Sequence, residues 1–165
     1  MAPSVEPVAV PGGSLVASVP FHDYADAFRM RVEEGAVPNV DALARAFARG
    51  APAWIRALMW LRDGFAGLVG LKRSSDAPAN GAHDPLEVGG FIGFFRIVAR
   101  DDHEIVAGED DRHLDFRVSF LHEGGYVTVT TVVRFNSALG RAYFVPVKPF
   151  HRRIVPAMMR AAFAA

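Results

Sequence analysis

The sequence predicts an α+β fold, because its strand-like and helix-like segments are separated along the chain. Residues 90–136 contain four segments of alternating apolar and polar side chains, joined only by short turns. Two helix-like segments, residues 40–49 and 52–69, precede them, and a third, residues 140–164, follows. Antiparallel hairpins of this kind form a sheet with one apolar face, and the helices are expected to pack against that face.

The N-terminal region carries four prolines and two adjacent glycines within residues 1–20. We expect an irregular leader there, ordered only where residues 15–19 lie along a sheet edge. Residues 21–165 are expected to form a single domain. Its first strand is predicted at residues 24–32, where apolar and arginine side chains alternate. Asp26 falls on the apolar side of this strand, near its start.

The two helices before the sheet have clear start signals. Asn39 is a good N-cap for the first helix, and Gly50 can close it. Pro52 suits the first turn of the second helix. The apolar residues of that helix share one arc: Trp54, Leu58, Leu61, Phe65, Leu68 and Val69. Glycines after Asp63 are expected to bend or fray it, and residues 72–88 read as a loop.

The main strands are predicted at residues 91–100, 104–108, 113–122 and 125–136. In the third strand the apolar face holds Leu114, Phe116, Val118 and Phe120. In the fourth it holds Val127, Val129, Thr131, Val133 and Phe135. Thr131 is therefore the polar exception on an apolar surface.

The C-terminal helix is interrupted by Pro146, Pro149 and Pro156, so a kink or a restart at Pro149 is expected. Its apolar arc includes Phe150, Ile154, Val155, Met158 and Ala162. His151 falls near the middle of that arc. This is the most unusual position of an ionisable group in the chain.

The composition of the chain excludes several classes of function. The chain has 165 residues, 51% of them apolar, which suits one domain with a substantial core. Basic and acidic residues both number 18, so no positive field exists to hold nucleic acid. Cysteine is absent, which excludes disulfides and thiol chemistry. No uncharged run is long enough to span a membrane, and a cytoplasmic location is expected by default.

No cofactor or metal site is expected. The histidines lack metal-binding spacing, and the acidic turn at residues 109–111 reads as a solvated turn. Dinucleotide, P-loop and nucleophile-elbow motifs are also missing from the sequence.

Several short motifs, in this order, resemble the START-like or SRPBCC superfamily, and more narrowly a bacterial family of unknown function within it. The resemblance covers nearly the whole chain after Pro20. It rests on these residues: Trp54, Leu58-Met59, Leu61-Arg62-Asp63, Gly70-Leu71-Lys72, Gly108-Glu109-Asp110-Asp111, His113-Leu114-Asp115-Phe116-Arg117, Gly140-Arg141-Ala142-Tyr143 and Pro149-Phe150-His151.

The resemblance implies a helix-grip fold, in which a curved antiparallel sheet wraps around a long C-terminal helix. It also implies an internal cavity for apolar ligands. The superfamily includes lipid carriers, hormone-binding proteins and polyketide aromatases or cyclases, so it does not imply one chemistry. It supplies no catalytic residues for this chain.

Two sets of residues are candidates for chemistry. His151 faces the core and needs a hydrogen-bond partner, which is either a ligand in a cavity or a carbonyl of the sheet. His113 and Asp115 stand on alternate positions of one strand with Arg117. They form either an acid/base cluster or ion pairs on the outer face, and the buried apolar residues between them favour ion pairs.

Four more residues complete the expected ligand site. They are Tyr143, eight residues before His151, together with Thr131, Arg62 and Trp54. Arg62 is also explained by pairing with a neighbouring carboxylate.

The first hypothesis is a domain that binds an apolar or amphipathic small molecule between the sheet and the C-terminal helix. The alternatives are a non-redox enzyme, such as a polyketide-type cyclase or dehydratase that uses an acid/base histidine, and an interaction subunit whose exposed Trp60 or Phe163 marks a partner surface. Whether the chain is an enzyme, and whether it forms a homodimer, stays open at this point.

Overall fold

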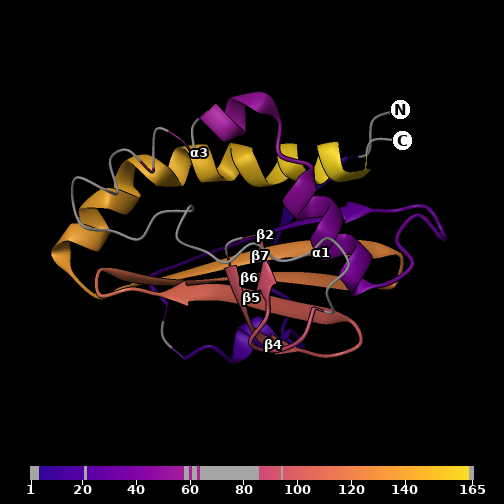
Figure 1. Cartoon of the computed structure of the whole chain (residues 1–165), viewed down its shortest axis with the longest axis horizontal. Coiled ribbons are helices and arrows are strands. Elements are labelled where there is room, and N and C mark those ends of the chain that lie inside the picture. Colours follow the sequence, from indigo (N-terminus) through magenta and orange to yellow (C-terminus); the bar gives the residue numbers. More distant parts are fainter. Residues whose placement is uncertain are drawn as a thin grey trace.

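A computed structural model describes residues 4–20, 22–57, 60, 63, 86–93 and 95–163 of the protein. These residues form one curved, antiparallel, seven-stranded sheet with the order β1-β2-β7-β6-β5-β4-β3 (Figure 1). Its strands are β1 (Val5–Val8), β2 (Tyr24–Arg31), β3 (Phe91–Ile92), β4 (Phe95–Arg100), β5 (Glu104–Asp110), β6 (Leu114–Glu123) and β7 (Tyr126–Phe135).

Two helices cover one face of this sheet. The long C-terminal helix α3 (Ala138–Phe163) packs over β1, β2 and β7, and α1 (Val40–Arg49) packs over β5 and β6 (Figure 1). Residues 53–57 are also helical. The rest of the predicted second helix and of the predicted loop falls largely outside the described residues. The arrangement is the α+β helix-grip fold that the sequence predicts.

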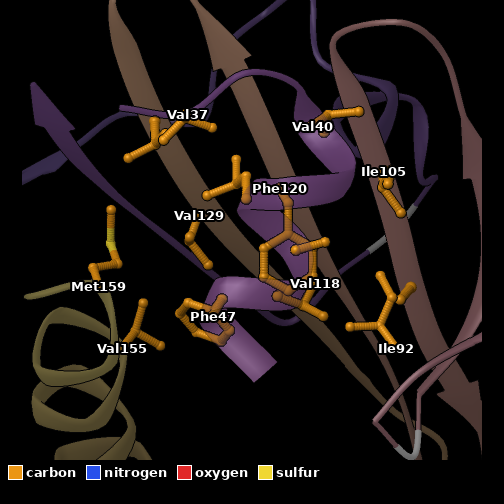
Figure 2. Packing of buried hydrophobic residues seen from close by; sticks show 14 of the residues in the cluster. Val37, Val40, Phe47, Ile92, Ile105, Val118, Phe120, Val129, Val155 and Met159 are labelled. Atoms are coloured by element: carbon orange, nitrogen blue, oxygen red, sulfur yellow. The ribbon is translucent and has the colours of Figure 1, made fainter. Parts of the chain in front are cut away.

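The main core lies between the sheet and these helices. Figure 2 shows Val155 and Met159 of α3 reaching toward Phe47 of α1 and Val129 of β7. The ring of Phe47 also lies 5.1 Å from the ring of Phe120. Val155 of the predicted arc of α3 therefore meets part of the apolar faces of β6 and β7 in this cluster. The arc was wrong at Phe150, which is 49% exposed, and it did not include the fully buried Met159.

The strand boundaries differ from the prediction in several places. Strand β5 extends through Glu109 and Asp110, which were expected to lie in the turn. The expected strand at residues 91–100 is divided into β3 and β4, which pair with each other in a tight hairpin. Gly93 sits at the bend with a φ of 59°, a conformation that glycine adopts at little cost. The expected leader also contributes β1, which pairs with β2 and extends the sheet by one strand.

The second face of the sheet is not wholly polar. A short 3-10 helix, η1 (Leu15–Ser18), lies on the side opposite α3 (Figure 1). Its Val16 packs with Val106 and Val132 in a small separate core. Glu104, 1% exposed, holds η1 there by accepting hydrogen bonds from the Ser14 hydroxyl at 2.5 Å and from the Leu15 amide at 2.6 Å.

Helix α3 runs continuously through Pro146, Pro149 and Pro156, without the restart that was considered at Pro149. Each proline removes one backbone donor, and α3 changes direction along its length in Figure 1. At its start, Gly140 donates its amide hydrogen to Ser137 Oγ at 3.1 Å. A Cβ at position 140 would lie 1.9 Å from the His113 carbonyl oxygen, so only glycine permits this close approach.

Candidate functional site

One carboxylate interrupts the apolar face that α3 covers. Asp26 lies on β2, on the same face as Phe28 and Met30, which belong to the main core. Its cross-strand partner on β7 is Thr131, and Thr131 in turn stands opposite Val118 on β6. Asp26 and Thr131 thus form a polar spot on an otherwise apolar surface.

Helix α3 brings His151 to this spot. Its Nδ1 atom lies 3.2 Å from Asp26 Oδ2, and the Tyr24 hydroxyl donates to the same oxygen at 2.5 Å. Tyr24 and Asp26 are two residues apart on β2 and therefore share a face. We refer to Tyr24, Asp26 and His151 together as the Asp26 cluster.

The two oxygens of Asp26 are used unequally. Oδ2 accepts both hydrogen bonds, whereas Oδ1 is buried and has no hydrogen-bond partner in the described part of the chain. The Asp26 side chain is only 10% exposed. A buried acceptor without a donor costs about 1–3 kcal/mol, so a bound molecule that supplies a donor would regain that free energy.

The environment of Tyr24 keeps its hydroxyl protonated. Burial, followed by the hydrogen bond to Asp26, raises the pKa of Tyr24 to about 12, while the positive charge of Arg152 opposes part of the shift. The ammonium group of Lys148 lies 5.2 Å from the centre of the Tyr24 ring. Two cations of α3 therefore border the cluster.

The contacts of His151 also indicate where its hydrogen lies. A carboxylate oxygen only accepts, so Nδ1 carries the hydrogen and the lone pair of the neutral ring lies on Nε2. Nε2 has no hydrogen-bond partner among the described residues, and the His151 side chain is 20% exposed. His151 is thus fixed by one nitrogen and open at the other.

The other predicted ligand residues are placed differently. Thr131 is buried beside Asp26, as described above. Tyr143 is half-buried on α3, about 12 Å before His151 along the helix axis. Trp54 is 47% exposed on the helical residues 53–57, and Arg62 lies outside the described residues.

His113 and Asp115 do not contact each other directly in this structure. Arg112 donates to His113 Nε2 at 3.0 Å, which leaves Nδ1 as the donor to Ser137 Oγ at 3.0 Å. Asp115 accepts from the Asn136 side chain at 2.7 Å. These contacts join the start of β6 to the segment before α3. His113 and Asp115 therefore help to hold the start of the helix in place.

The Arg117 guanidinium pairs with Asp110 at 2.7 Å and also donates to the Phe116 carbonyl. It serves the β5–β6 hairpin and does not reach an acid/base pair. Within the described ranges, no three His, Asp or Glu side chains gather closely enough to hold a metal ion.

Two surface hollows lined by described residues lie away from the Asp26 cluster. One, of about 240 Å³, includes His22, Arg117 and Arg134. The other, of about 540 Å³, surrounds the β6–β7 turn and includes Glu33 and His122. Neither contains a member of the cluster.

Sequence reasoning identified His151 and Thr131 but did not join them to Asp26 and Tyr24. The one available signal was the position of Asp26 on the apolar side of its strand. The pairing itself links residues 125 positions apart and depends on how α3 crosses the sheet.

The fold and this site define an α+β helix-grip domain with a partly buried Asp–His pair that joins the sheet to its C-terminal helix. The chain belongs to the DUF2867 family, described as a protein of unknown function, whose family model matches residues 19–158. This agrees with the expected membership of a family of unknown function. No curated protein and no solved structure matches the chain. Among the described helices, none is both long and apolar enough to cross a bilayer.

Proposed function

We propose that the protein binds an apolar or amphipathic small molecule between the sheet and α3, with the Asp26 cluster at the polar end of the ligand. The observation that carries this proposal is the buried Oδ1 of Asp26 on the apolar face of the sheet, to which no group in the described ranges donates a hydrogen bond. A polar atom in that position costs stability unless something donates to it. Thr131 adds a second polar group beside it.

The chemistry of the Asp26 cluster restricts the class of ligand that can bind there. Asp26 Oδ1 can only accept, so the ligand must donate a hydrogen bond. Lys148 and Arg152 already place positive charge next to Tyr24, which disfavours a cationic ligand. A neutral hydroxyl on an apolar body, as in an alcohol or a phenol, fits these two conditions.

The layout of the fold supports the same proposal. An antiparallel sheet beneath a long C-terminal helix is the arrangement of the START-like superfamily, and we propose that the chain is a member. Proteins of that superfamily hold apolar ligands between these two elements. Fold alone does not fix function, so the Asp26 cluster carries the argument.

A matched pair of probes tests the proposal. By calorimetry, 2-naphthol, which donates a hydrogen bond, should bind about tenfold more tightly than 2-methoxynaphthalene, because one hydrogen bond to a carboxylate contributes about 1.5 kcal/mol. Asp26→Asn should abolish this preference, because the Asn NH₂ group then occupies one of the two oxygen positions. Asp102→Asn, in the exposed β4–β5 turn, is the control and should retain it.

Equal affinities for the two probes, or a preference that survives Asp26→Asn, would contradict the proposal. Native mass spectrometry of the purified protein would then show whether any small molecule is carried, and would also give the oligomeric state. A protein that binds neither probe and carries no adduct would favour an interaction role, for which Trp60, 80% exposed, is the first surface residue to change.

A further inference from the structure

We propose that His151 acts as a general base toward the bound molecule, with Asp26 as its positioning residue. This inference rests on the proposed ligand site but assigns it an activity as well as an affinity. The proposal is based on the arrangement of His151: its Nδ1 contacts the Asp26 carboxylate, and its Nε2 has no hydrogen-bond partner among the described residues.

The geometry matches the requirements for base catalysis. The carboxylate of Asp26 holds the ring in the tautomer whose lone pair is on Nε2, and it stabilises the imidazolium that forms when Nε2 takes a proton. Tyr24 donates to the same carboxylate oxygen and so fixes the orientation of the carboxyl group. A histidine with a purely structural role would be expected to use both nitrogens in hydrogen bonds when packed in a core.

The substrate then needs an acidic hydrogen and a hydrogen-bond donor on an apolar body. The donor binds at Asp26 Oδ1, and the acidic C–H or O–H lies at His151 Nε2. Among the described residues, Tyr24 and Asp26 of β2 contact His151, and Lys148 and Arg152 of α3 lie beside Tyr24.

A probe reaction tests the base without knowledge of the natural substrate. 5-Nitrobenzisoxazole is apolar and carries an acidic hydrogen on C3. His151 Nε2 takes this proton, the C–H electron pair forms a C≡N triple bond, and the N–O bond breaks to give the phenolate of 2-cyano-4-nitrophenol. The imidazolium then returns its proton to water, and the coloured phenolate reports the rate.

The wild-type protein should accelerate this elimination about 100-fold more than His151→Gln does, a typical contribution of a positioned base. His103→Gln, in the exposed turn between β4 and β5, is the matched control and should retain the full rate. Free imidazole should restore part of the rate to His151→Ala, which rules out misfolding as the cause of the loss.

The Asp26→Asn variant tests whether Asp26 positions His151 for catalysis or only fills space in the core. It should lower kcat about tenfold and leave KM for 5-nitrobenzisoxazole unchanged, because the imidazolium loses its carboxylate partner while the probe has no donor for Asp26. Equal rates for wild-type protein and His151→Gln at every pH would overturn the proposal. If the rates are equal but 2-naphthol still binds in an Asp26-dependent way, His151 is not a general base and the ligand-site proposal is still supported. If elimination depends on His151 and the naphthol preference is absent, the ligand proposal fails and the base stands.

Discussion

At the scale of single residues, the Asp26 cluster is where the sequence departs from what stability alone would select. An apolar residue at position 26 would continue the core formed by Phe28 and Met30, and it would leave no acceptor unpaired. The protein instead buries a carboxylate, one oxygen of which accepts no hydrogen bond from the part of the chain that the structure describes. Buried ionisable groups that cost stability are found preferentially at functional sites.

Tyr24 gives this cluster a pH dependence that can be measured. The pKa of Tyr24 is raised from 10.0 to about 12 in the folded protein, so the unfolded chain loses this proton at lower pH than the folded one. The stabilising contribution is present below pH 10.0 and is lost as the pH rises toward about 12. Thermal unfolding followed between these pH values should show a steeper fall in Tm for wild-type protein than for Tyr24→Phe.

The control is Tyr126→Phe, at the end of β7 far from Tyr24. The Tm of this variant should fall with pH as steeply as that of the wild-type protein. If Tyr24→Phe keeps the wild-type slope, the Tyr24 hydroxyl is not held in its protonated form by burial and Asp26.

Residue-level prediction from the sequence succeeded where periodicity was informative. The 3.6-residue period placed His151 toward the core, and the two-residue period placed Thr131 and Asp26 on the apolar face. Which of these side chains meet could not be predicted. That depends on the register of β2 against β7 and on the path of α3, and both are set by tertiary packing.

At the scale of elements, the start of α3 is fixed by contact with the sheet. Gly140→Ala would place a Cβ 1.9 Å from the His113 carbonyl oxygen, a backbone atom that cannot move aside without shifting β6. We expect this variant to lose more than about 2 kcal/mol of unfolding free energy, measured by urea denaturation. Gly12→Ala, where nothing lies within 4 Å, is the control and should change it by less than about 0.5 kcal/mol. Equal effects would show that the helix start tolerates displacement.

Glu104 and η1 form a second anchoring point, on the opposite face of the sheet. The buried carboxylate accepts from Ser14, from the Leu15 amide and from Ser119. Ser14→Ala should cost about 1–3 kcal/mol in urea denaturation, because it removes a donor from a buried charge. Ser18→Ala, whose hydroxyl bonds only to the exposed turn, should cost much less. A similar cost for the two variants would mean that Glu104 does not hold this segment.

Element-level prediction was strongest for the hairpins and for α1, where turn residues and caps are local signals. It was weaker for the leader. Strand β1 has no strand-like pattern in its own sequence, and it forms because it pairs with β2. The continuity of α3 through three prolines also has a tertiary cause: its packing on the sheet and α1 offsets the hydrogen bonds that the prolines remove.

At the scale of the whole molecule, the sheet separates two environments. One face carries the main core and the Asp26 cluster beneath α3, and the other carries the small core around Val16 with Glu104. The separation of strands and helices along the sequence was enough to predict the α+β class. The covered second face was not predicted. Val106 and Val132 are buried there because η1 lies over them, and that contact depends on tertiary packing.

Because the two faces of the sheet are separate, the ligand proposal can be tested by measuring on which face a ligand binds. An NMR titration with 2-naphthol, observing the Thr131 methyl group, the His151 ring and the Val16 methyl groups, reports both faces at once. We expect saturable shifts at Thr131 and His151, with Val16 unmoved, and the loss of those shifts in Asp26→Asn. Shifts confined to Val16, or binding that leaves Thr131 and His151 unmoved, would contradict a ligand site between the sheet and α3.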